Sequence, residues 1–99
     1  MLNITKDLQD KKLVIGLEGK LDTITAPDFE KAVKENIEGV EELVFDLEKL
    51  EYITSAGLRV LLSAQKTMNE QGTMTVINVN EDINDVFEVT GFADFLNIE

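Results

Sequence analysis

The stretch from Leu43 to Val79 reads LVFDLEKLEYITSAGLRVLLSAQKTMNEQGTMTVINV and predicts a strand, a helix and a second strand in succession. Leu43-Val44-Phe45 is continuously apolar, which is typical of a strand covered on both faces. From Ser55 onwards the apolar residues follow helical spacing, and Gly72 supplies the end of that helix. Met74 to Val79 is then a second buried strand. This order favours a right-handed crossover between parallel strands.

The residues before this unit predict a hairpin and another helix. Leu2 to Thr5 alternates apolar and polar residues, and a polar turn around Asp10 leads into the apolar run Leu13 to Leu17. We interpret the pair as a β-hairpin whose first strand lies at a sheet edge. Thr25 then opens a helix as a hydroxyl cap, followed by Pro27 in the first turn and Asp28 three residues after the cap. Gly39 is expected to close this helix.

The residues after the unit predict one more short helix. Asn80 can cap a helix that carries Ile83, Val86 and Phe87 and ends at Gly91. Phe95 to Ile98 either adds a last strand or packs against the core. The predicted class is α/β, a single domain over residues 1–99. Its sheet has four to five mostly parallel strands and an N-terminal antiparallel edge strand, with helices packed on it.

Composition narrows the range of functions. The 99 residues carry a formal net charge of −11, which repels nucleic acid and anionic lipid and favours partners with basic patches, although solubility alone is the simpler interpretation. No apolar run is long enough to span a bilayer, and the N-terminus shows no secretion signal. The absence of cysteine fits the cytoplasm, where we expect the protein to act as a monomer when free.

The sequence offers little for catalysis. It contains no histidine, and therefore lacks the commonest acid–base catalyst and metal ligand. Phosphate-binding glycine loops, a nucleophile elbow and a calcium loop are also missing. We therefore predict a protein that is not an enzyme and that needs no cofactor or metal.

Two short stretches follow predicted strands, at the end of the sheet where open α/β folds bind ligands and partners. One is Glu18 to Asp22, and the other is Leu50 to Leu58. In the second stretch Thr54 is a plausible N-cap, which puts Ser55 at the first helical position, where a phosphate would meet the positive end of the helix dipole. Gly57 costs about 1 kcal/mol against alanine in a helix, so this turn is expected to need low bulk or a close approach.

These two stretches resemble the STAS family, and specifically bacterial anti-sigma factor antagonists. The family has a Gly-x-Leu-Asp segment after an early strand and an Asp-Ser-[Ser/Thr/Ala]-Gly-Leu segment opening a helix. Here the segments read Gly19-Lys20-Leu21-Asp22 and Thr54-Ser55-Ala56-Gly57-Leu58. The length and the order of elements match as well, so the resemblance covers nearly the whole chain and implies a STAS-like fold.

The resemblance also implies a switch. In the family, the serine at the position of Ser55 is phosphorylated by a serine kinase that is itself the anti-sigma factor. The unphosphorylated antagonist binds this kinase and frees the sigma factor, and a PP2C-type phosphatase reverses the modification. The implied partner-binding residues are Asp22, Thr54, Ser55, Ala56 and Gly57, and Tyr52 and Arg59 are near enough to be candidates.

Two points remain open at this stage. Asp22 is either a partner contact or a turn residue that satisfies its own backbone, and as an ordinary loop carboxylate it is expected to add little stability. Thr54 stands where the best-known antagonists have aspartate. This departure allows an alternative function. The chain would then be a STAS adaptor subunit that is never phosphorylated and serves a larger assembly such as a lipid-transport ATPase complex.

Overall fold

The computed structural model describes residues 2–99, and its first two strands form the predicted hairpin. Strand β1 (Leu2–Gln9) pairs antiparallel with β2 (Lys12–Leu21) from Leu2 opposite Gly19 to Gln9 opposite Lys12. The turn between the strands has two residues, and Asp10 takes a φ of 56°, a left-handed conformation that aspartate tolerates and that suits tight hairpins. The polar turn was therefore read correctly, and β1 extends further than the predicted Leu2 to Thr5.

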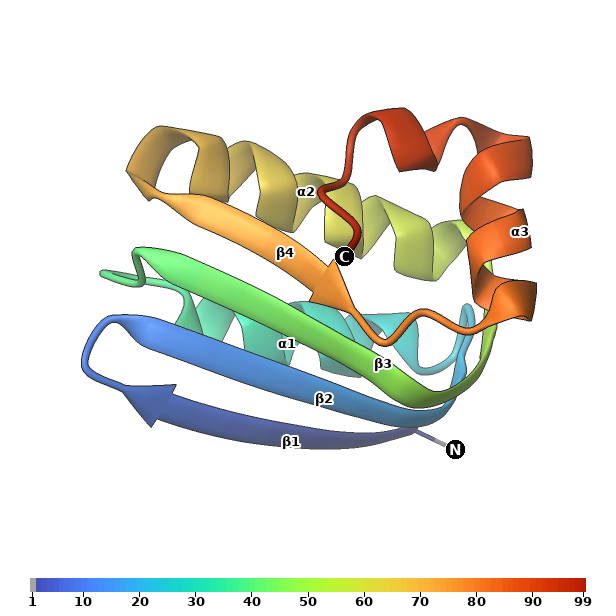
Figure 1. The fold of residues 1–99 in the computed structure, drawn as a ribbon. Helices are drawn as coiled ribbons and strands as arrows, with labels where there is room; N and C mark the ends of the chain where they lie inside the picture. The colour runs from blue at the N-terminus through green and yellow to red at the C-terminus, as the bar shows by residue number, and fades with distance from the viewer. Residues whose placement is uncertain (1) are drawn as a thin grey trace.

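The remaining strands are parallel and complete a four-stranded sheet in the order β1-β2-β3-β4 (Figure 1). Strand β3 (Glu42–Ile53) pairs with β2 on one side and with β4 (Thr73–Ile77) on the other. The predicted class is confirmed, with β1 as the antiparallel edge strand. Strand β3 is much longer than its apolar run, because charged residues on its exposed positions conceal its second half.

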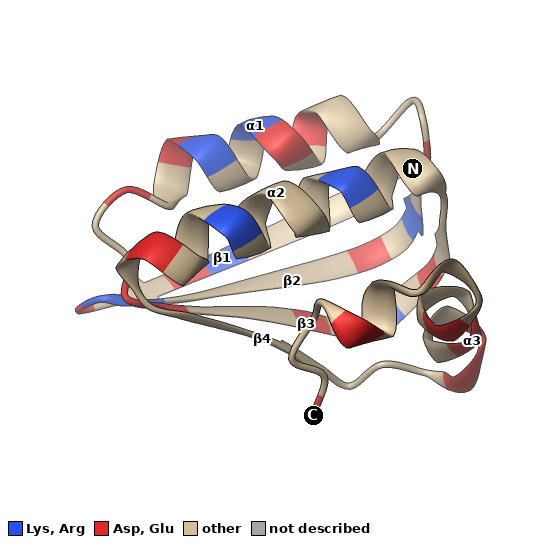
Figure 2. Cartoon of the chain, turned by 90° about the horizontal axis from the view of Figure 1, so that it is seen from above, with Lys and Arg blue, Asp and Glu red and all other residues tan. Residues whose placement is uncertain are grey.

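Helices α1 (Ala26–Asn36) and α2 (Ser55–Gln71) cover the same face of the sheet, as the two perpendicular views show (Figures 1 and 2). The inward side chains of β2, β3 and β4 pack against Phe29, Leu61 and their neighbours in one core. Leu43, Val44 and Phe45 are all buried, as their continuous apolar run predicted. Val44 is buried but lies outside that core, in register between Val14 and Thr75 of the neighbouring strands.

The short helix α3 (Glu81–Thr90) lies beside the part of β3 that runs beyond the end of β4 (Figure 1). Asn80 fixes it there with both ends of its amide. Its Oδ1 accepts a hydrogen bond from the Ile83 N–H at 2.9 Å, and its Nδ2 donates to the Leu50 carbonyl at 2.9 Å. The predicted cap at Asn80 and the helix end at Gly91 are confirmed, and Gly91 takes a left-handed conformation there.

The last residues pack back on β4. A 3₁₀ turn, η1 (Phe92–Asp94), follows α3, and Ile98 forms a single parallel bridge with Val76. The C-terminal segment therefore contributes one bridge to the edge of β4 and not a full fifth strand. Within residues 2–99, none of the helices combines the length and the apolar character needed to cross a membrane.

Candidate functional site

The two stretches singled out in the sequence meet at the carboxyl ends of β2 and β3. The Thr54 N–H donates to the Leu21 carbonyl at 3.0 Å, so the chain enters α2 directly beside the end of β2. Leu21 is fully buried, and its side chain fills the place where Gly57 has no side chain. A Cβ on Gly57 would lie 2.5 Å from Leu21 Cγ and 3.1 Å from Ile53 Cγ1. The low bulk predicted at Gly57 thus lets the two stretches touch.

The glycine of the first stretch has a backbone role. Gly19 takes a φ of 105°, a conformation that residues with a side chain rarely adopt. The pairing of β2 with β3 shifts register between Gly19 and Lys20, which is an irregularity of the β-bulge kind. Gly19 therefore shapes the end of β2 and so determines where Leu21 and Asp22 lie.

Asp22 holds the turn that starts α1. Its Oδ1 accepts hydrogen bonds from the Ile24 N–H at 2.9 Å and the Thr25 N–H at 3.0 Å, and the Thr25 hydroxyl lies 3.2 Å from the same oxygen. These bonds favour the charged form and lower the pKa of the Asp22 carboxyl, the Thr25 N–H contributing most and desolvation opposing it. The turn-residue interpretation is therefore correct. From these bonds we expect Asp22 to add more stability than an ordinary loop carboxylate does.

Thr25 stands at the N-cap position of α1 but does not cap the helix with its hydroxyl. The hydroxyl donates to the Lys20 carbonyl at 2.9 Å and accepts from the Asp22 N–H at 2.9 Å. The predicted hydroxyl cap is therefore wrong, because the Thr25 hydroxyl bonds to the end of β2 and to Asp22 and not to the first turn of α1. The Thr25 hydroxyl and the Asp22 carboxylate together close the turn between β2 and α1.

Thr54 occupies the N-cap position of α2, as predicted, with an extended φ of −107°. The predicted side-chain cap is wrong, because the Thr54 hydroxyl makes no hydrogen bond to the first turn and is buried without a partner among residues 2–99. The first intrahelical bond joins the Leu58 N–H to the Thr54 carbonyl at 3.0 Å. The N–H groups of Ser55, Ala56 and Gly57 therefore precede the intrahelical ladder.

Ser55 is the accessible group of this turn. Its side chain is exposed, Ala56 is half-buried and Gly57 is buried. The first turn of α2 carries no acidic residue, and the charge view shows the start of this helix without red, whereas red gathers over α3 (Figure 2). A hydroxyl at this place is open to solvent and lies at the positive end of a 17-residue helix.

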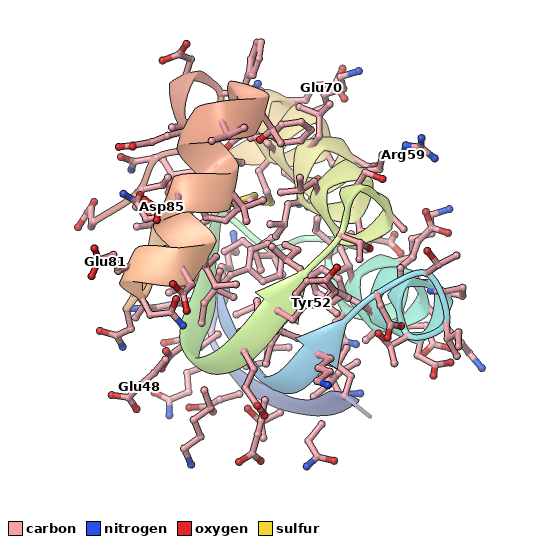
Figure 3. The ribbon with its side chains drawn as sticks, turned by 90° about the vertical axis from the view of Figure 1, so that its right-hand side faces the viewer. Glu48, Tyr52, Arg59, Glu70, Glu81 and Asp85 are labelled. Carbon is pink, nitrogen blue, oxygen red and sulfur yellow. The ribbon has the colours of Figure 1, made fainter. Side chains whose placement is uncertain are left out.

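The surface around Ser55 combines apolar and charged side chains. Ile24 is 85% exposed in the turn before α1, and Tyr52 is 53% exposed at the end of β3. A groove of about 190 Å³ lies between the first turns of α1 and α2, and we call it the N-terminal groove; it is lined by Thr23, Ala26, Pro27, Glu30, Ala56, Arg59 and Val60. Seen from this end, Arg59 points away from α2 at the side of the molecule, and Tyr52 lies at the end of β3 (Figure 3).

The sequence reasoning named Tyr52 and Arg59 but missed Ile24. The signal was available, since Ile24 is an isolated apolar residue in the polar turn Asp22 to Thr25. An apolar side chain at such a place has no core to enter. Ile24 therefore adds an exposed apolar side chain to the turn whose Thr23 lines the N-terminal groove together with Ala56.

Comparison with known proteins agrees with the fold. The STAS domain model matches residues 3–99. A Bordetella bronchiseptica protein, provisionally named anti-sigma factor antagonist BtrV, is 32% identical, with 98% of this chain and 85% of the relative covered. The crystal structure of an anti-sigma factor antagonist from Mycobacterium paratuberculosis superposes with a TM-score of 0.90 at 21% identity, over 99% of this chain and 85% of the other.

The Bacillus protein SpoIIAA has the same fold. Its unphosphorylated and phosphorylated structures each give a TM-score of 0.77, at 17% and 18% identity, covering 98% of this chain and 87% and 91% of theirs. The chain therefore belongs to the STAS domain family. Its homologues within that family are anti-sigma factor antagonists, which are typically non-enzymatic regulators.

Proposed function

We propose that this chain is an anti-sigma factor antagonist that binds an anti-sigma factor serine kinase while Ser55 is unmodified and so releases a sigma factor. Phosphorylation of Ser55 ends the binding, and a PP2C-type phosphatase restores it. The observation that carries the proposal is the contrast between neighbouring hydroxyls, since Ser55 is exposed whereas the Thr54 hydroxyl is buried. A kinase can therefore reach one of them and not the other.

The proposed partner-binding residues have different tasks. Ser55 and Ala56 offer contact surface, and Ile24 adds an exposed apolar side chain in the turn before α1. Gly57 and the Thr54 hydroxyl are buried, so these two residues shape the partner-binding surface without offering these groups for contact. Asp22 keeps one carboxylate oxygen engaged with the turn, and the other is the part that a partner would meet.

The physical basis of the switch is the cost of covering a charge. A phosphate adds a charge of about −1.5 to −2 at a spot that the partner covers. Burying that charge without a counter-ion costs several kcal/mol, which lowers affinity at least a hundredfold at about 1.4 kcal/mol for each factor of ten. The fold itself accepts the anion at the start of α2. The two SpoIIAA structures, which resemble this chain equally well, agree with such tolerance in a relative.

The setting follows from this function. The chain acts in the cytoplasm, where sigma factors meet RNA polymerase, and has no turnover of its own because the kinase and the phosphatase perform the chemistry. It needs no cofactor and makes no direct contact with nucleic acid, which its net charge of −11 repels. The free protein is a monomer.

One observation favours a second function. Thr54 replaces the aspartate that precedes the serine in the best-known antagonists, and its buried hydroxyl gives a kinase no negative charge to recognise. If no kinase acts on Ser55, the same surface serves as the docking face of an unmodified STAS adaptor in a larger assembly, such as a lipid-transport ATPase complex.

Phosphosite mapping separates the two functions. The protein is incubated with ATP and source lysate, reisolated, and examined by mass spectrometry. The chain has only two serines, and Ser63 is exposed on α2, so Ser63→Ala is the matched control for Ser55→Ala. Phosphate that is lost in Ser55→Ala and kept in Ser63→Ala supports the switch. Absence of phosphate, or phosphate elsewhere, supports the adaptor.

A further inference from the structure

Arg59 lies one helical turn after Ser55 and has no ion-pair partner in residues 2–99. Within residues 2–99, three ion pairs join Lys11 to Glu41, Lys12 to Glu42 and Lys34 to Glu30. Arg59 is exposed, and its side chain projects from α2 into solvent (Figure 3). It is also the only basic residue that lines the N-terminal groove. A cation is thus left free at the edge of the surface proposed for the partner.

The spacing of Ser55 and Arg59 brings their side chains onto one face of α2. Residues four apart in a helix have Cβ atoms about 5–6 Å apart, and side chains lean towards the helix N-terminus. The longer Arg59 side chain is therefore within reach of a group carried on Ser55. A guanidinium group binds phosphate through two parallel hydrogen bonds, and this geometry suits an arginine better than a lysine.

The competing carboxylates are accounted for. Glu30 lines the same groove but is already paired with Lys34 at 3.9 Å. Asp22 is bonded to the turn before α1. The first turn of α2, all of it described, has no acidic residue. Nothing on α2 near Ser55 therefore competes with a phosphate for Arg59.

We propose that Arg59 is an internal counter-ion which clasps the phosphoryl group on Ser55 once that residue is modified. This inference rests on the proposed function and deepens it. Phosphorylation then changes the surface twice, because it adds an anion to the first turn of α2 and withdraws the one cation from the N-terminal groove. A partner that used the free guanidinium loses that contact, and the phosphate is held against the helix and not left to swing freely.

The clasp can be tested without the kinase or any other partner. Phosphoserine is inserted at position 55 during translation by a suppressor tRNA, and ³¹P NMR follows the second ionisation of the phosphate with pH. With Arg59 in place, the phosphate pKa should be lower by about half a pH unit than in Arg59→Gln. Arg59→Lys should recover part of the shift, because it keeps the charge but not the paired donors.

The matched control is Lys66→Gln, which removes an exposed cation from the same helix about two turns further on. It should leave the phosphate pKa unchanged. Equal shifts in Arg59→Gln and Lys66→Gln would mean a general field and overturn the clasp, as would no shift in either variant. Because no partner is needed, the clasp can fail while Ser55 still controls binding, and Ser55 can fail as a switch while the clasp is still observed.

Discussion

Replacing Gly57 by alanine is the sharpest structural test of how the two stretches meet. The added Cβ would lie 2.5 Å from Leu21 Cγ and 2.7 Å from Leu21 Cδ2, against about 3.5–4.0 Å for ordinary carbon contacts. Leu21 is fully buried and Ile53 is 3.1 Å away on the other side, so neither can yield freely. Overpacking of this kind costs about 1–3 kcal/mol.

Helix propensity acts in the opposite direction. Alanine is better than glycine in a helix by about 1 kcal/mol, so the net loss is expected to be about 1 kcal/mol. For a domain of this size that loss lowers the melting temperature by roughly 4–8 °C. Urea unfolding at equilibrium measures it directly. Ser63→Ala, at an exposed position of the same helix, is the control, and it should be neutral or slightly stabilising.

A double-mutant cycle locates the clash. Leu21→Ala alone should cost about 2–5 kcal/mol because it empties a core site. In that background Gly57→Ala should become neutral or stabilising, since the atoms that it met are gone. If Gly57→Ala stabilises the unaltered protein by about 1 kcal/mol, as propensity alone requires, then Leu21 does not pack against this turn and the account of the site is wrong.

Three further results are expected. The pKa of Asp22 is lowered in the folded state, so the unfolded chain binds the proton more readily, and the stabilisation exists above about pH 4 and is lost as pH falls through the folded pKa. The urea midpoint of the wild type should therefore fall more on acidification than that of Asp22→Asn. Equal dependence of the two midpoints on pH would argue against the hydrogen bonds in the turn. Thr54→Val should match or exceed the wild type in stability, since it removes an unpartnered buried hydroxyl, whereas a loss of about 1 kcal/mol would mean that Thr54 caps α2 after all. Kinase binding should weaken as salt rises, and an affinity independent of salt would exclude a basic partner face.

The periodicity of the sequence was enough for the order and type of the elements. The alternation from Leu2, the helical spacing after Ser55 and the cap at Asn80 are local signals, and each matches the structure. Element ends were less accurate. Gly39 was expected to close α1, but the helix ends at Asn36 and Gly39 lies in the following turn with a φ of 79°. A glycine indicates a turn more reliably than it indicates the last residue of a helix.

The site was harder to predict where hydrogen bonds choose among several partners. Thr25 and Thr54 both stand at N-cap positions, yet one hydroxyl turns back to Lys20 and the other is buried without a partner. These choices depend on the neighbouring strand end and cannot be read from residue type. The contact of Gly57 with Leu21 is different. A glycine at this helix start predicted a close approach, and only the identity of the contacting residue could not be predicted.

The most direct test of the proposed switch is the affinity of the purified kinase partner for four forms of the chain, measured by calorimetry. Wild type and Ser55→Ala should bind alike, because alanine deletes only a small exposed hydroxyl. Ser55→Asp should bind more weakly, and the form phosphorylated at Ser55 at least a hundredfold more weakly, since it carries nearly two charges instead of one. All four forms should have similar melting temperatures, so a change in affinity does not reflect unfolding. Equal affinity of all four forms would contradict the switch and leave the unmodified adaptor in its place.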